Sequence, residues 1–110
     1  MKYFEKIKEN RDFRRIYNRG KSAVAKEFVL YACSGKPGKV RLGITATKKI
    51  GCAVNRNRAK RVITAAFREC AADISQGDFV IVARSGILRV KSTRVAQIMK
   101  KQLTEFGFLK

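Results

Sequence analysis

Hydrophobic positions in the first half of the chain change from a helical to an alternating period. Phe13, Ile16 and Tyr17 repeat at helical spacing, and Gly20 ends this segment, which predicts a short amphipathic helix beginning near residue 10. Residues 26–34 and 40–47 alternate instead, which is typical of strands that use both faces. The Gly- and Pro-containing residues 35–38 separate the two segments and predict that they form an antiparallel hairpin.

The second half contains the longest helical pattern, over residues 55–70. Its apolar positions follow one helical stripe, and Asn55 is the expected N-cap. Residues 79–84 then form a continuous apolar run typical of a buried strand. Ser92 or Thr93 opens a last helix, which Gly107 is expected to cap. A further short strand is possible near residues 47–51, and the whole order predicts a single α+β domain over residues 1–110, with helices packed on a small sheet.

Charge adds a strong constraint, because 26 Lys and Arg face only 8 Asp and Glu and the formal net charge is +18. From residue 28 to residue 68 there are ten basic residues and no acidic one. A surface that only needs to be soluble normally mixes both signs. The imbalance favours a polyanionic partner, with nucleic acid as the first candidate.

Other compositional features narrow the class of protein. The charged N-terminus and the lack of a long apolar run predict a cytoplasmic location. Cys33, Cys52 and Cys70 have no CxxC spacing, and the chain has no His, so we interpret them as reduced thiols and expect no zinc site. The absence of His and of an acidic cluster also argues against a two-metal nuclease site made by the protein itself.

The helix predicted over residues 55–70 carries most of the candidate binding chemistry. Opposite its apolar stripe a helical projection places Asn57, Lys60, Arg61, Thr64 and Arg68, and Arg56 and Arg58 flank this ridge. Guanidinium groups can pair with two phosphate oxygens and can stack on bases. An ordinary solvated helix face is the alternative, but such faces usually carry acidic partners, and the first acid here is Glu69.

Residues 48–61 resemble the signature of the protein subunit of bacterial ribonuclease P, and Arg56-Asn57-Arg58 is its RNR motif. The full segment is Lys-Lys-Ile-Gly-Cys-Ala-Val-Asn-Arg-Asn-Arg-Ala-Lys-Arg. Residues 11–17, 28–31 and 79–84 are similar to other segments of that family, in the same order. The resemblance implies an αβββαβα order like the second domain of a small-subunit ribosomal protein. It also implies that the RNR helix lies in a left-handed βαβ crossover, against the usual hand.

The same resemblance implies a function. An RNA subunit with magnesium ions would cleave precursor tRNA to remove the 5′ leader. The protein, one copy per RNA, would assist by binding the leader and stabilising the active RNA, with no catalytic residue and no cofactor of its own. The implied contacts to the catalytic RNA are Arg56, Asn57, Arg58, Lys60, Arg61, Arg68, Lys48 and Lys49. Solvation alone remains an alternative for the two lysines.

The resemblance also implies a cleft for the single-stranded leader, lined by Phe13, Tyr17, Tyr31 and Phe28. Aromatic stacking on unpaired bases suits such a task. Core packing is the alternative for Phe13 and Phe28, and strand alternation puts Phe28 and Tyr31 on opposite faces, so both cannot line one cleft. We favour Tyr31 on the cleft side.

Two positions depart from the family pattern. Tyr17 stands where Phe is common, and Thr64 stands where Arg is frequent, which removes one possible phosphate contact. Composition by itself would also fit an RNA-binding module such as a ribosomal protein, or a cationic protein that binds DNA or acidic lipid. The order of the motifs favours ribonuclease P.

Overall fold

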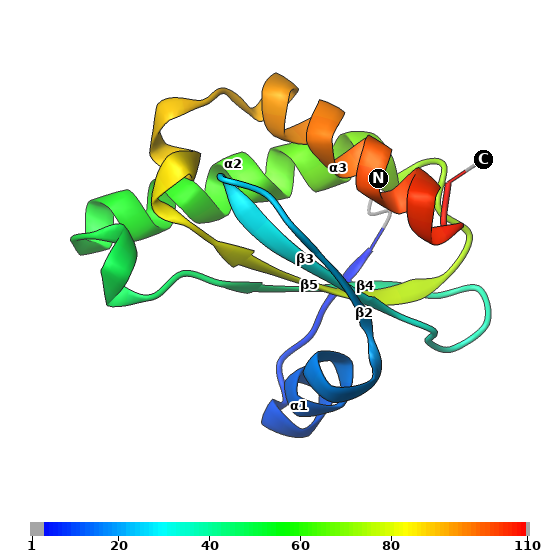
Figure 1. Ribbon diagram of the computed structural model, residues 1–110. Helices are drawn as coiled ribbons and strands as arrows, with labels where there is room; N and C mark the ends of the chain where they lie inside the picture. The colour runs from blue at the N-terminus through cyan, green and yellow to red at the C-terminus, as the bar shows by residue number, and fades with distance from the viewer. Residues whose placement is uncertain (1–3, 110) are drawn as a thin grey trace.

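The computed structural model describes residues 4–109 and has one five-stranded sheet with helices on both faces (Figure 1). The strands are β1 (Glu5–Lys6), β2 (Lys21–Val24), β3 (Phe28–Cys33), β4 (Val40–Thr45) and β5 (Gly77–Ala83). The helices are α1 (Asn10–Arg19), α2 (Ala53–Ala71) and α3 (Ser92–Phe106), with short 3-10 helices η1 (Lys48–Ile50) and η2 (Ser85–Arg89). In Figure 1, α1 lies on one side of the sheet, and α2 and α3 lie together on the other.

The sheet order is β1-β4-β5-β3-β2, and the predicted hairpin is therefore wrong. β3 pairs with β5 antiparallel and β4 pairs with β5 parallel, so β5 separates the two strands that the sequence suggested as neighbours. Five of the seven β5 residues are apolar and run consecutively from Phe79 to Ala83, as suits a central strand covered on both faces. The loop after β3 crosses the start of β5, where Gly77 N–H donates to the Lys39 carbonyl at 2.9 Å.

From α1 onward the element order is αβββαβα, as expected, but one strand lies elsewhere than predicted. Residues 48–50 form η1 instead of a strand, because the Thr47 hydroxyl accepts from the Lys49 N–H and Gly51 turns the chain at φ 123°. The additional strand is β2, which pairs with β3 at the sheet edge. Its side chains are mostly exposed, so its four residues carry little hydrophobic signal.

The helix boundaries agree with the pattern to within a few residues. α2 begins at Ala53, with Cys52 as its N-cap, so the predicted cap at Asn55 is wrong. β4, α2 and β5 form the expected βαβ unit with adjacent parallel strands. Gly107 caps α3 in the left-handed conformation at φ 87°, as predicted, and its N–H donates to the Leu103 and Thr104 carbonyls.

The sheet separates two apolar clusters of unequal size. The larger one joins the sheet to α2 and α3, and Phe67 of α2 lies near its centre, with ring centroids 5.1 Å from Phe4 and 5.5 Å from Phe79. The smaller one, under α1, is built on Ile7, Ile16 and Val80. The strand alternation predicted from the sequence thus separates a face covered by the larger cluster from a face covered by the smaller one. Among residues 4–109, α1 is the only helix on the face with the smaller cluster.

Candidate nucleic-acid interface

The exposed face of α2 brings together the basic residues predicted from the sequence. The helix buries Ala59, Ile63 and Phe67 against the sheet, and this fixes the opposite face toward solvent. Asn57, Arg58, Lys60, Arg61 and Arg68 are all exposed there. A shallow groove, to which β1 contributes Lys6, runs along this surface and is lined by Lys6, Asn57, Lys60, Arg61, Thr64, Ala65 and Arg68. We call this set with Arg58 the basic face.

Arg56 differs from its neighbours because it is only half exposed. Its Nη1 donates to the Gly51 carbonyl at 3.1 Å, so its guanidinium ties the first turn of α2 to the loop that precedes it. Lys48 and Lys49 lie in η1 just before this loop and are exposed. The RNR motif therefore combines one arginine that orders the start of the helix with another, Arg58, that is free toward solvent.

The N-terminal turn of α2 adds to the positive potential. It contains no acidic residue, and the backbone N–H groups of Asn55 and Val54 lower the pKa of the exposed Cys52 thiol at the N-cap. Unpaired N–H groups and the helix dipole both favour an anion at this position. The start of α2 therefore extends the basic face toward η1.

Thr64 lies in the middle of the basic face but does not offer its hydroxyl freely. Its Oγ1 donates to the Lys60 carbonyl one turn earlier, at 2.7 Å. This backbone hydrogen bond is common for Thr inside a helix. A short side chain without charge therefore lines the middle of the groove.

Three aromatic side chains form a cluster on the α1 side of the sheet. The ring centroids of Tyr17 and Tyr31 are 4.9 Å apart in an edge-to-face arrangement, and those of Phe13 and Tyr17 are 6.4 Å apart. The Tyr17 hydroxyl lies 3.2 Å from Thr45 Oγ1, so α1 also contacts β4. Tyr17 is 37% exposed. Phe13, Tyr17 and Tyr31, which we call the aromatic cluster, lie together, as the resemblance implied.

Phe28 is a correction to the predicted cleft. Its side chain is fully buried, on the opposite face of the sheet, among the residues packed under α2 and α3. Strand alternation places Tyr31 toward α1 and Phe28 away from it. Phe28 is a core residue and cannot stack on a base in the aromatic cluster.

A pocket of about 220 Å³ connects the aromatic cluster with the basic face. Phe13 of α1 lies on one side, Lys60 and Thr64 of α2 lie on the other, and β4 together with the residues that flank β1 provides an apolar wall. The remaining lining residues are Phe4, Lys6, Ile7, Leu42 and Ile44. Sequence reasoning missed this junction, because nothing local indicates that β1 pairs with β4 as the edge strand and that the two helices meet at this edge of the sheet.

Gly43 of β4 lies directly against Phe13. A Cβ at this position would lie 2.7 Å from two Phe13 ring carbons, closer than real contacts allow. The Gly43→Ala variant is therefore expected to displace the Phe13 ring and to cost about 1–3 kcal/mol of stability through overpacking. Urea unfolding measures this cost. Gly38→Ala, in the turn before β4, is the comparison: an added Cβ meets no atom there, so any loss of stability comes from the positive φ and not from overpacking. An unchanged free energy of unfolding for Gly43→Ala would contradict the contact.

One ionic cluster joins α1 to the sheet beside the aromatic cluster. Asp78 of β5 is 1% exposed and accepts from Arg41 Nε and Nη2 at 2.9 and 2.8 Å, and also from Arg15 Nη2. Asp12 of α1 lies 3.5 Å from Arg41 Nη1 and 3.9 Å from Arg15 Nη2. We call Asp12, Arg15, Arg41 and Asp78 the ionic clamp.

The electrostatics of the ionic clamp follow from its pairing. Burial by itself would raise the pKa of Asp78, but hydrogen bonds from Arg41 and Arg15, together with their charges, hold it below its ordinary value. The hydrogen bond with Asp78 likewise raises the pKa of Arg41. The guanidinium groups of Arg41 and Arg15 are therefore both directed at one internal carboxylate.

The depressed pKa of Asp78 predicts how stability depends on pH. Its stabilisation is complete above the unfolded-state pKa of about 3.9 and is lost as the pH falls through the lower folded-state value. The free energy of unfolding should therefore fall more steeply below about pH 4 in the natural protein than in Asp78→Asn. Urea unfolding at pH 7 and pH 3 measures this, and a difference between the two proteins that stays constant with pH would contradict it.

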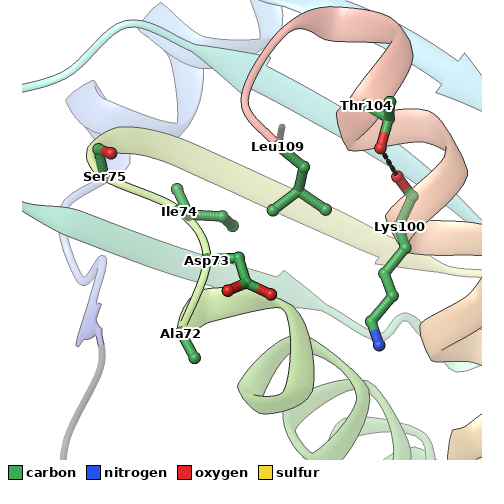
Figure 2. Close-up of a pocket in the computed structure, with 7 residues that line it drawn as sticks. All are labelled: Ala72, Asp73, Ile74, Ser75, Lys100, Thr104 and Leu109. Atoms are coloured by element: carbon green, nitrogen blue, oxygen red, sulfur yellow. Dashed lines mark hydrogen bonds between the residues drawn. The ribbon is translucent and has the colours of Figure 1, made fainter.

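A further depression lies between the end of α2 and the end of α3 (Figure 2). Asp73 and Lys100 line it, and the Thr104 hydroxyl beside them donates to the Lys100 carbonyl at 2.7 Å. None of the predicted site residues contributes to this depression. It is separate from the basic face and the aromatic cluster.

Among residues 4–109, no three His, Cys, Asp or Glu side chains gather where they could hold a metal ion. None of the helices in that range has the length and apolar character needed to cross a membrane.

The fold is a small α+β domain. Its basic face and aromatic cluster have the chemistry of a nucleic-acid-binding protein. Comparisons with known proteins then give the family. The family model described as Ribonuclease P matches residues 1–107. The ribonuclease P protein component of Macrococcus caseolyticus is 44% identical over 80 residues, which cover 72% of this chain and 70% of the relative. That of Clostridium botulinum is 43% identical over 82 residues, which cover 73% and 74%.

Solved structures agree with these relatives. The RNase P protein of Staphylococcus aureus superposes with a TM-score of 0.81 at 31% identity, over 100% of both chains. That of Thermotoga maritima gives a TM-score of 0.79 at 29% identity, over 92% of this chain and 96% of the other. The chain therefore belongs to the ribonuclease P protein family, and its fold is that of RNase P proteins. Membership makes it a component of the bacterial ribonuclease P complex, which implies an RNA partner.

Proposed function

We propose that this protein holds the catalytic RNA of ribonuclease P on its basic face and the 5′ leader of precursor tRNA on its aromatic cluster. The RNA subunit, with bound magnesium ions, carries out the cleavage that releases the leader. One copy of the protein acts with one RNA in the cytoplasm, and it raises the affinity for precursor and for magnesium. The observation that carries this proposal is the placement of two different surfaces, which meet at one pocket.

The chemistry of the two surfaces suits two kinds of RNA. Five exposed polar or basic side chains on one helix face can follow the phosphates of a structured RNA without reading its bases. The partly exposed rings of Tyr17 and Tyr31 offer edges and faces to unpaired bases, and stacking accepts any base. A leader that varies in sequence from one precursor to the next requires this tolerance.

The pocket between α1 and α2 supports a continuous path for RNA. Phe13 belongs to both the pocket and the aromatic cluster, and Lys60 belongs to both the pocket and the basic face. A strand of RNA on the aromatic cluster therefore runs toward the phosphates held by α2. This geometry would bring the leader close to the catalytic RNA.

Reconstitution tests the proposal. The protein is added to a bacterial ribonuclease P RNA, and cleavage of precursor tRNA is measured as magnesium is lowered, with precursors that carry a long or a one-nucleotide leader. The protein should lower the magnesium requirement and should tighten the binding of the long-leader precursor only. Tyr31→Ala should remove most of the leader effect and should leave affinity for the RNA subunit unchanged.

The same experiment separates this function from that of a general RNA-binding module. Such a module would bind both precursors and unrelated structured RNA with equal affinity at matched salt. Equal affinity for all three RNAs, with no change in the magnesium requirement, would contradict the proposal.

A further inference from the structure

The helix that carries Phe13 and Tyr17 has little support of its own. α1 has ten residues and buries only one of them, Ile16, against Ile7 and Val80. Isolated helices of this length are marginal in water, so tertiary contacts must hold α1 in place. Ile16, with the partly buried Phe13 packed beside it, fixes the distance of α1 from the sheet, but these contacts lie on one face of the helix and restrain its roll about its axis only in part.

The ionic clamp supplies a second anchor on a different side of α1. Asp12 and Arg15 are three residues apart, and they reach Arg41 on β4 and Asp78 on β5. Arg15 Nη1 also donates to the Ser34 carbonyl at 3.4 Å, just after β3. α1 is thus tied to the ends of three adjacent strands. Because Asp78 accepts from both arginines at once, the clamp restrains the direction in which the helix faces.

The aromatic residues alternate with the clamp residues along α1. Phe13 follows Asp12 directly, and Tyr17 comes two residues after Arg15. A roll of about 20° would move side-chain ends, at a radius of about 5–6 Å, by about 2 Å. Such a shift would separate Tyr17 from Tyr31, because edge-to-face ring pairs depend on centroid distance and angle.

From this geometry we infer that Asp12, Arg15, Arg41 and Asp78 are positioning residues for leader binding: they set the roll of α1 and thereby the spacing of the aromatic cluster. The inference rests on the proposed function of that cluster. It also assigns Arg15 and Arg41 an internal role, although both are cations beside a proposed RNA surface. Their side chains are only 32% and 20% exposed, and each is paired with the Asp78 carboxylate.

The test compares Arg15→Ala with Arg14→Ala, which removes the same charge from an exposed neighbour on the same helix. The readout is the ratio of affinities for long-leader and one-nucleotide-leader precursors, measured with the reconstituted complex. Arg15→Ala should reduce this ratio about three- to tenfold, as expected for the loss of one hydrogen bond of ordinary net strength, and Arg14→Ala should change it less than twofold. Arg15→Lys, which retains a cation within reach of Asp78, should restore part of the ratio.

The Asp78→Asn variant tests the inference through the direction in which leader affinity changes. It removes a negative charge beside the aromatic cluster, so simple electrostatics predicts tighter leader binding, whereas release of the clamp predicts weaker binding. Nuclear Overhauser contacts between the rings of Tyr17 and Tyr31 in the free protein report the position of α1 directly. These contacts should weaken in Arg15→Ala and persist in Arg14→Ala.

The outcomes separate this inference from the proposed function. If the natural protein shows no preference for the long leader, the proposed function fails, and the ring contacts still decide whether the clamp positions α1. If the preference exists but Arg15→Ala and Arg14→Ala reduce it equally, with ring contacts intact in both, the positioning role is overturned. Because Arg15→Ala leaves Asp78 paired with Arg41, these comparisons stand even if Asp78→Asn does not fold.

Discussion

Replacing Arg58 and Arg61 together by Ala is expected to weaken assembly with the RNA subunit about thirtyfold. Both side chains are exposed on the basic face of α2, with no internal partner among the hydrogen bonds and ion pairs of residues 4–109, so their charge is free for phosphate. About 1 kcal/mol for each lost contact gives this factor. Arg56 is left in place because its guanidinium also holds the Gly51 carbonyl.

The dependence of assembly on salt gives the sharper measurement. Each lost phosphate contact should reduce the slope of log affinity against log salt by about 0.9. The double variant should therefore lower the slope by about 1.8. Arg94→Ala with Lys101→Ala is the matched control, because it removes the same charge from exposed positions on α3. If both pairs change the slope equally, the basic face has no special role and only net charge matters.

The second large effect concerns the layer that supports α2. Phe67→Ala is expected to lower the free energy of unfolding by about 3–5 kcal/mol, as for other buried Phe residues. Phe67 is fully buried, and its ring contacts Phe4 on one side and Phe79 of β5 on the other. The cavity would lie directly beneath the helix that presents the basic face, so RNA affinity should fall with stability.

Urea unfolding with detection by far-UV circular dichroism measures this loss. Val54→Ala is the control, since Val54 lies on the same helix but is 71% exposed, and its replacement should change stability by less than about 0.5 kcal/mol. A loss below about 1 kcal/mol for Phe67→Ala would show that the core repacks around the missing ring. Such a small loss would contradict the claim that the Phe67 ring holds α2 in position on the sheet.

Much of the candidate site could be predicted from short segments of sequence. Residues at i, i+3, i+4 and i+7 share one helix face wherever the helix lies, so the pattern of α2 already identified Lys60, Arg61 and Arg68 as a group. Alternation in β3 likewise separated Tyr31 from Phe28. The assignment of Phe28 to the cleft came from resemblance and contradicted that alternation, and the structure supports the alternation.

The sequence by itself determined the apolar and polar faces of the helices and strands, the excess of positive charge and the RNR motif. Each of these depends on residues that are close together in the chain. Only the tertiary structure decided which strands are neighbours, since hydrogen bonding between strands carries no sequence code that fixes the partner. It placed β5 between β3 and β4, and so joined Asp78 to Arg41, 37 residues away, and to Arg15, 63 residues away. The ionic clamp and the pocket between α1 and α2 exist because of that order.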